Sequence, residues 1–265
     1  MYSFPIIFMR SLLFNLLFYG ATAIACIVLI PFLFASRKII LNITLSYLAC
    51  AQFLMRYVLG ITYEIRGKEN LPKTGSYLLA AKHQSAYETL KLHALLGDPT
   101  IVLKEELIKI PLFGQFLNKL DVIPINRKNK ETAIQSIIDG AQRMSKANRP
   151  IVIFPQGTRV AVDTNSKEKP YKGGIVKMYT QTNLPIVPMA LNTGLFWGRN
   201  GFIKKPGLVI FEFLPPIESG LPEKKVMKAL EDRLEQKSNL LAQESIEKYS
   251  HLPQLQLTYE RKENE

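Results

Sequence analysis

Hydrophobic residues are concentrated at the start of the chain, between Arg10 and Arg37, where 26 consecutive residues carry no formal charge. As a helix this run would be about 39 Å long, against about 30 Å for the hydrocarbon core of a bilayer. It can therefore span a membrane, although Gly20 and Pro31 make a kinked helix that enters one leaflet and returns an equally physical outcome. A cleaved signal peptide is the disfavoured alternative, because cleavage at the small residues of 21–25 would leave about ten apolar residues at the new terminus.

A second apolar run follows at 39–61, and its polar residues suit a helix at the membrane interface better than a second full span. These residues are Asn42, Ser46, Gln52 and Arg56. Arg10 flanks one end of the first run and three basic residues follow its other end, which favours a cytoplasmic location for the remainder of the chain. We therefore expect 1–61 to be an uncleaved membrane-anchoring segment, with the rest of the protein on the cytoplasmic face of the inner (cell) membrane.

After residue 61, short β-rich runs alternate with helical patterns, which is typical of an α/β domain. The runs that we expect to form strands are 77–81, 100–103, 122–124, 150–154, 186–191 and 208–213. The helical patterns cover 86–96, 132–145 and 222–248, and the apolar stripe of 132–145 should pack on a sheet. We predict one α/β domain over 62–250, built as a mixed sheet with flanking helices, and a solvated tail over 251–265.

The composition fits one large domain with a buried core plus an apolar segment, since 47% of the 265 residues are hydrophobic. Basic residues outnumber acidic ones by 34 to 22, and the segment 64–197 alone holds 19 basic against 11 acidic residues. Anionic partners are therefore favoured. No nucleic-acid-binding module is visible, so we expect no nucleic acid as a partner. Cys26, Cys50 and three scattered histidines form no ligand cluster, and no metal site is expected.

The most informative polar motif runs from His83 to Glu88, where an expected strand gives way to an expected helix. Sheets of α/β proteins place their sites at such junctions. A histidine with a carboxylate five positions later can act as a general base, because the carboxylate orients the ring and stabilises the imidazolium. The same residues also form a helix capping box, in which Glu88 would return to the backbone amide of Ser85. The pattern alone leaves both interpretations open.

Two further expected strands are followed by a turn that carries an arginine. The run 154–159 follows the most apolar strand, where Gly157 permits a tight turn and Arg159 offers a planar fork suited to phosphate. Another such run ends at Arg127. Taken singly, each is an ordinary strand end with a solvated arginine, and the apolar strand at 186–190 is either core or the wall of an apolar binding site.

In this order and at these spacings, four blocks resemble the motifs of the glycerolipid acyltransferases, and most closely those of the 1-acylglycerol-3-phosphate (lysophosphatidate) acyltransferases. The blocks are 83–88, 123–127, 154–159 and 186–188. The resemblance covers residues 60–220, and an apolar helical leader is common in that family. Two positions depart from the family pattern: Glu88 stands where Asp is usual, and Gln156 stands where Glu is usual.

The resemblance implies a mechanism in which His83 takes the proton of a glycerol hydroxyl, which attacks the carbonyl of an acyl thioester. Glu88 stabilises the resulting His83 cation, and no acyl-enzyme forms. The implied substrate-binding residues are Lys104, Arg127, Gln156, Gly157, Thr158 and Arg159, with the three cations on the acceptor phosphate and Lys172 as a weaker candidate. Gln156 can position a hydroxyl but cannot act as a base. No cofactor or metal is implied.

The expected reaction acylates lysophosphatidate to phosphatidic acid in phospholipid synthesis, with the membrane bilayer, lysophosphatidate and the acyl donor as partners. The donor, either acyl-CoA or acyl-acyl carrier protein, stays open. Alternative acceptors are another lysolipid, such as a lyso-ornithine lipid or lysophosphatidylglycerol, and glycerol 3-phosphate. A non-catalytic membrane protein that binds anionic lipid would also explain the charge and the leader, but it gives the pairing of His83 with Glu88 no purpose.

Overall fold

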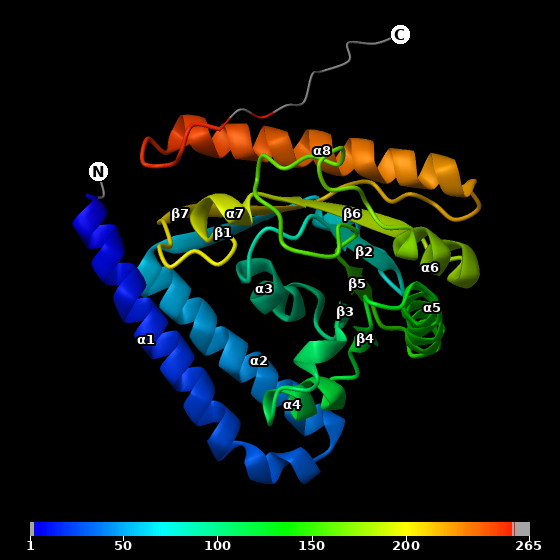
Figure 1. Cartoon of the computed structure of the whole chain (residues 1–265), viewed down its shortest axis with the longest axis horizontal. Coiled ribbons are helices and arrows are strands. Elements are labelled where there is room, and N and C mark those ends of the chain that lie inside the picture. Colours follow the sequence, from blue (N-terminus) through cyan, green and yellow to red (C-terminus); the bar gives the residue numbers. More distant parts are fainter. Residues whose placement is uncertain (1–2, 256, 258–265) are drawn as a thin grey trace.

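The computed structural model describes residues 3–255 and 257. It shows a seven-stranded sheet with helices on both faces and a pair of long helices that extends away from the sheet (Figure 1). The strands are β1 (Ile61–Arg66), β2 (Leu78–Ala81), β3 (Thr100–Lys104), β4 (Ile123–Ile125), β5 (Ile151–Ile153), β6 (Ile186–Leu191) and β7 (Gly207–Phe213). The α-helices are α1 (Phe4–Val28), α2 (Arg37–Leu54), α3 (Tyr87–Leu96), α4 (Phe113–Lys119), α5 (Lys130–Lys146), α6 (Gly174–Thr182), α7 (Thr193–Phe196) and α8 (Glu223–Lys248). Short helical turns are η1 (Ile30–Phe34), η2 (Met55–Leu59), η3 (Lys68–Asn70) and η4 (Glu105–Leu107).

The strand order is β1-β7-β6-β2-β5-β3-β4. Strand β7 runs antiparallel to β6, and the other neighbouring pairs are parallel, so the sheet is mixed as predicted. The register places Ala80 of β2 beside Ile153 of β5, and Ala81 beside Met189 of β6. Because these parallel strands end at one edge of the sheet, the loops that follow them lie close together there.

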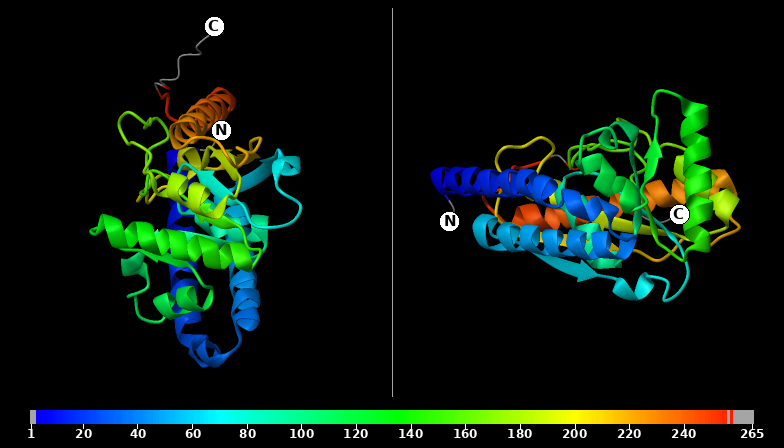
Figure 2. Two further views of the ribbon diagram at one scale, coloured as in Figure 1. Left: turned by 90° about the vertical axis from the view of Figure 1, so that its right-hand side faces the viewer. Right: turned by 90° about the horizontal axis from the view of Figure 1, so that it is seen from below.

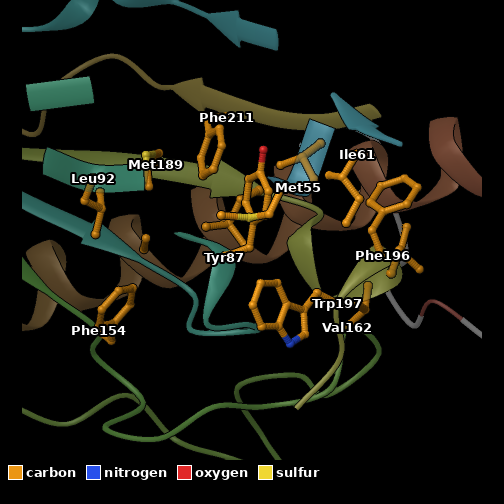
Figure 3. Packing of buried hydrophobic residues seen from close by; sticks show 14 of the residues in the cluster. Met55, Ile61, Tyr87, Leu92, Phe154, Val162, Met189, Phe196, Trp197 and Phe211 are labelled. Atoms are coloured by element: carbon orange, nitrogen blue, oxygen red, sulfur yellow. The ribbon is translucent and has the colours of Figure 1, made fainter. Parts of the chain in front are cut away.

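Both faces of the sheet are buried, because alternate residues of each strand point into different clusters. In β2, Leu78 packs with residues of α5, α6 and α8, whereas Leu79 packs with α1, η2 and α3. Figure 3 shows Tyr87 of α3 in the second cluster, beside Met55 and Phe211. The rings of Tyr87 and Phe211 are 6.1 Å apart and nearly parallel. This packing fixes the start of α3 relative to β2, where the predicted motif lies.

The helices α1 and α2 form an antiparallel hairpin whose turn, η1, lies beside α4 (Figures 1 and 2). Near the sheet the hairpin is packed on the domain, since the ring of Phe14 lies 5.4 Å from that of Trp197 and Phe18 lies 6.1 Å from it. At the far end Arg37 pairs with Asp98 at 2.6 Å. Large apolar side chains cover the exposed surface of α1. Both helices are long and apolar enough to cross a membrane, a criterion that core helices and signal sequences also meet.

The pattern of apolar residues predicted most of these elements. All six expected strands are present with ends within one residue, and the three expected helices are α3, α5 and α8 with ends within two residues. Strand β1 was not expected, because its first residue continues the apolar leader and half of its residues are exposed at the sheet edge. Gly20 lies inside the unbroken helix α1, and the chain reverses at η1, which contains Pro31.

The segments on either side of the predicted domain pack into its core, although their composition indicates a membrane anchor and a solvated tail. Phe14 and Leu59 of the predicted anchor belong to the same buried cluster as Phe211 of the sheet. Leu252 is buried in that cluster as well, so the first residues of the expected tail pack on the domain and are not fully solvated. The remainder of the expected tail, 256 and 258–265, lies outside the described residues.

Candidate active site

His83 lies two residues beyond β2 and Glu88 lies in the first turn of α3, so a tight strand-to-helix connection brings them together. The His83 Nδ1 atom is 2.8 Å from Glu88 Oε1, and the exposed side-chain fractions are 19% for His83 and 0% for Glu88. The His83 ring also stacks on Phe154, with ring centroids 4.1 Å apart. Nε2 makes no hydrogen bond to any residue that the structure describes. The ring is therefore held on one face and at one nitrogen, which leaves the other nitrogen for a substrate.

The Glu88 carboxylate serves two purposes at once. Its Oε1 atom accepts hydrogen bonds from the backbone amides of Gln84 (2.8 Å) and Ser85 (2.7 Å) in addition to facing His83. Its Oε2 atom accepts one from the Thr193 hydroxyl at 2.8 Å. The Ser85 hydroxyl in turn accepts from a backbone amide at the start of α3, at 3.0 Å. The capping box and the histidine pairing are thus not alternatives, because one carboxylate makes both.

A cavity of about 540 Å³ begins at His83 and extends to the α1–α2 hairpin. Its wall near His83 comes from the loop after β5 and includes Gly157 and Thr158. Its far wall is apolar and comes mainly from the hairpin, α3 and α4: Ala25, Leu29, Ile43, Leu48, Leu90, Phe116 and Leu117. The cavity therefore joins a histidine–carboxylate pair to a channel suited to a hydrocarbon chain.

Four cationic side chains line the same cavity as His83: Lys104, Arg127, Arg159 and Lys172. Lys104 pairs with Glu106 at 3.0 Å, whereas no described carboxylate forms an ion pair with Arg127, Arg159 or Lys172. Desolvation lowers the pKa of the Arg127 guanidinium. It also lowers the pKa of the Lys172 ammonium, and the nearby charge of Arg127 adds to that effect. Cations that repel one another around a cavity are suited to binding a multiply charged anion.

The turn after β5 brings two of these cations to the cavity. The Gly157 amide donates to the carbonyl oxygen of Phe154 at 2.9 Å, and Gly157 has a φ of +70°, a conformation that favours glycine. A Cβ atom at Gly157 would lie 3.0 Å from Lys172 Nζ, so the glycine also lets Lys172 cross the turn closely. Two residues later Arg159 donates to Asn200 Oδ1 at 3.3 Å.

Comparison with known proteins places this geometry in a family. A family model described as Acyltransferase matches residues 62–192. The 1-acyl-sn-glycerol-3-phosphate acyltransferase of Pseudomonas aeruginosa is 32% identical over 206 residues, which are 76% of this chain and 77% of that protein. The chain belongs to the acyltransferase family. The protein of the same name from Limnanthes alba is 33% identical over 168 residues, and the match spans 63% of this chain and 58% of the plant protein.

A solved structure shows that the acyltransferase shares its fold with a known enzyme. The crystal structure of the 1-acyl-sn-glycerophosphate acyltransferase PlsC from Thermotoga maritima matches with a TM-score of 0.70 at 21% sequence identity. The match covers 88% of this chain and 96% of that chain. The α/β fold with its mixed sheet, flanking helices and N-terminal apolar helices is therefore a confirmed prediction. The named relatives, and not this likeness of fold, show that the chain is an O-acyltransferase.

Six of the eight predicted site residues of the acyltransferase line one cavity, and two, Glu88 and Gln156, do not. Lys104, Arg127, Gly157, Thr158 and Arg159 line the cavity with His83, while the paired Glu88 lies behind the histidine. This grouping follows from the cavity lining and the hydrogen bonds described above. Their roles in binding and catalysis stay predictions.

Gln156 is fully buried and is not part of the cavity wall. Its Nε2 atom donates to the carbonyl oxygen of Lys169 at 3.4 Å, and its Oε1 atom has no partner among the described residues. The side chain therefore contacts the loop that carries Lys172 toward the cavity. A role in substrate binding for Gln156 stays a prediction, and the geometry favours an indirect role through this loop.

Two residues that shape the acyltransferase site were not predicted from the sequence. Thr193 follows β6 and holds Glu88 from the opposite side of the connection, and its only signal was its place just after a predicted strand. His93 is buried, lines the cavity, and has an Nδ1 atom without a hydrogen-bond partner among the described residues. The contribution of such residues can be recognised only in the folded structure, where the sheet brings distant loops together.

Because His93 is buried, we expect the stability of the folded protein to depend on pH. Desolvation lowers the His93 pKa to about 4 in the folded protein, while an unfolded histidine has a pKa of about 6.5. Between these values the unfolded chain binds a proton that the folded protein does not, so the stability is fully present above pH 6.5 and falls as the pH drops toward 4. The difference of about 2.5 pKa units corresponds to about 3 kcal/mol.

The substitution His93→Leu should flatten this acid limb, because leucine fills a similar space and does not titrate. The measurement is the unfolding temperature of the purified enzyme in detergent at several pH values from 7.5 to 4 for both proteins. If both lose the same stability over this range, other groups cause the acid sensitivity.

Proposed function

We propose that the enzyme transfers a fatty acyl group from an acyl thioester to the free hydroxyl of 1-acylglycerol 3-phosphate and so forms phosphatidic acid. The observation that carries the proposal is that His83, which is paired with Glu88, shares one cavity with four cationic side chains and an apolar wall. The reacting hydroxyl of lysophosphatidate lies between a phosphate and an acyl chain, which such a cavity suits. The names of the relatives from bacteria and plants support the same acceptor.

In this mechanism His83 acts as a general base on the acceptor hydroxyl. Its Nδ1–H group donates a hydrogen bond to Glu88, so Nε2 has the free electron pair that takes the hydroxyl proton. The hydroxyl oxygen bonds to the thioester carbonyl carbon, the carbon–sulfur bond then breaks, and the departing thiolate takes the proton from His83. Glu88 stays ionised and stabilises the imidazolium between the two proton transfers. No covalent acyl-enzyme forms.

The acceptor phosphate would lie among the cations near His83. Arg127 and Lys172 lie close enough for their charges to interact, and Arg159 lines the same cavity. A planar guanidinium can hold two phosphate oxygens at once, whereas an ammonium acts as a point charge. A phosphomonoester dianion should therefore be preferred over a zwitterionic head group.

Arginine substitutions test this assignment of the acceptor. We expect Arg159→Lys to lower kcat/KM for lysophosphatidate by about tenfold to a hundredfold, because a hydrogen bond to a charged group contributes about 1.5–3 kcal/mol. Arg127→Ala should act mainly on the KM for the acceptor and leave the KM for the donor unchanged. The measurement is steady-state kinetics at fixed donor with lysophosphatidate, lyso-ornithine lipid, lysophosphatidylglycerol and glycerol 3-phosphate as acceptors.

The control for these variants is Arg143→Lys, an exposed arginine of α5 that lies outside the cavity. It should leave all kinetic constants unchanged. A higher kcat/KM with an acceptor that lacks a phosphomonoester would overturn the choice of lysophosphatidate. Arginine variants that behave like the wild type would overturn the role of these cations and leave the acyl-transfer chemistry untouched.

The two apolar helices suggest association with a membrane. We propose that the α1–α2 hairpin enters the bilayer from the cytoplasmic side of the inner (cell) membrane and that the cavity opens toward the lipid through its hairpin wall. Arg10 and Arg56, at the end of the hairpin near the sheet, fit this orientation, whereas Arg37 and Lys38 lie at the turn. Protease should then digest the α/β domain in inverted membrane vesicles and not in intact spheroplasts; the reverse pattern would place the domain on the other face.

A further inference from the structure

A second cavity, of about 720 Å³, adjoins the first one. The two share Thr158 and Arg159 in their walls, while His83 lines the first and the next residue, Gln84, lines the second. Most of the second wall comes from the loops that follow β5 and α7. The two cavities therefore meet at Thr158 and Arg159, and this shared wall offers a molecule in the second cavity a route to His83.

The second cavity carries an excess of positive charge. Its cationic lining residues are Arg159, Lys169, Arg199 and Lys205, against the acidic residues Asp163 and Glu168. None of the four cations forms an ion pair with a carboxylate in the part of the chain that the structure describes. Arg199 donates to the carbonyl oxygen of Arg159 at 3.1 Å, which holds the two guanidinium-bearing segments together. Desolvation lowers the pKa of Lys205, so its charge lies in a partly dry environment that an anion would stabilise.

Gln84 adds a neutral donor to this wall. Its side chain is fully buried, and its Oε1 atom accepts a hydrogen bond from the Gly194 amide at 3.0 Å. Its Nε2 atom is buried and has no hydrogen-bond partner among the described residues. Buried amide donors are normally satisfied, and a phosphate or carbonyl oxygen in the second cavity is a group that would satisfy this one. The unpaired donor and the cations therefore point independently to an oxygen-rich anionic ligand.

We propose that the second cavity binds the phosphate-bearing arm of the acyl thioester donor, an inference that rests on the proposed function. The reaction has two anionic substrates, and the structure has two sets of cations. Lys104, Arg127 and Lys172 line only the first cavity, where the acceptor phosphate would lie, and Arg199 and Lys205 line only the second. The thioester would cross the shared wall and place its carbonyl carbon beside His83. Coenzyme A and acyl carrier protein both present a phosphopantetheine arm, so the same chemistry serves either donor.

The test is a kinetic comparison of donors that have or lack the phosphate. The double variant Arg199→Gln/Lys205→Gln is assayed with lysophosphatidate and three donors: acyl-CoA, acyl-acyl carrier protein and the acyl thioester of N-acetylcysteamine, which has no phosphate. We expect the KM for the phosphate-bearing donors to rise about tenfold, as for one lost charge-assisted contact. The KM for the phosphate-free thioester, the KM for lysophosphatidate and the unfolding temperature should not change.

A matched control removes a charge from the same region outside both cavities. Lys167→Gln changes an exposed lysine that lines neither cavity and should leave every constant at the wild-type value. A rise confined to acyl-CoA or to acyl carrier protein supports the site and identifies the natural donor. An equal rise with the phosphate-free thioester, a rise in the acceptor KM, or no rise at all would overturn the proposal.

A binding measurement separates this proposal from the proposed function. Free coenzyme A is titrated into the wild type and the double variant by calorimetry, without an acceptor. Weaker binding to the double variant supports the second cavity as an arm site even if lysophosphatidate proves to be the wrong acceptor. Equal binding to both proteins, combined with normal acylation of lysophosphatidate, would reject the second cavity and leave the proposed function in place.

Discussion

Replacing His83 with alanine is expected to lower kcat by about 10²–10⁴-fold, which is the usual contribution of a general base. The loss should appear in kcat with little change in the KM for lysophosphatidate, since the cations that would bind the phosphate remain in place. Folding should be preserved, because the His83 side chain is partly exposed to the cavity and packs on Phe154 through one face. Steady-state kinetics and the unfolding temperature measure both effects.

His251→Ala is the matched control, because His251 lies outside both cavities and contacts the carbonyl oxygen of Pro206. Its activity should stay near that of the wild type. If His83→Ala kept a near wild-type kcat, the general-base mechanism would be wrong, whatever the acceptor.

Glu88→Gln, as part of the same test, separates the two functions of the carboxylate. A glutamine oxygen can still accept from the amides of Gln84 and Ser85, so the cap survives and the unfolding temperature should change little. A neutral amide cannot stabilise the His83 cation, so kcat should fall by a large part of the His83→Ala loss. An active Glu88→Gln enzyme would show that the residue acts only as a cap.

The sequence predicted the parts of the site that lie within one connection. His83 and Glu88 are five residues apart at a strand-to-helix junction, and the fold places their side chains in contact as the general-base interpretation requires. Arg159 likewise follows its strand within a few residues. Such motifs can be predicted because their residues are close in the sequence, and the end of a strand is where α/β sheets place their sites.

Contacts between distant segments could not be predicted in the same way. Thr193 bonds Glu88 across 105 positions of the chain, and Lys82 pairs with Glu235 across 153. Neither Thr193 nor Lys82 belongs to a pattern of spacing or periodicity that marks it as buried. The packing of Phe14 on Trp197 is of the same kind, since an apolar leader indicates a membrane segment and does not reveal that part of it completes the core of the domain.

The ion pair of Lys82 with Glu235 connects the residue before His83 to helix α8. Lys82 Nζ lies 2.9 Å from Glu235 Oε2, and their side chains are 0% and 7% exposed. Lys82 also donates to the carbonyl oxygen of Thr164 at 2.8 Å, and the Tyr171 hydroxyl donates to Glu235 Oε1 at 2.9 Å. The network therefore joins the residue before His83 to the middle and to the end of the loop between β5 and α6, which carries Lys172.

Removing one partner of this buried pair should destabilise the enzyme strongly. We expect Glu235→Leu to lower the free energy of unfolding by about 3–5 kcal/mol, because it leaves the Lys82 ammonium buried without a counter-charge. For a chain of this size that corresponds to a fall of about 6–20 °C in the unfolding temperature. The measurement is thermal unfolding of the detergent-solubilised protein, followed by circular dichroism.

Two further variants show whether the loss comes from the unpaired charge. Adding Lys82→Met to Glu235→Leu should recover part of the stability, since two apolar side chains of similar volume avoid the cost of burying either charge. Glu223 lies in the same helix as Glu235 and forms an exposed ion pair with Lys177 of α6. Glu223→Leu, which breaks this exposed pair, should lower the free energy of unfolding by less than about 1 kcal/mol. If Glu235→Leu were as stable as the wild type, the pair would contribute nothing to folding. If the double variant were less stable than Glu235→Leu, lost packing would explain the effect better than an isolated charge.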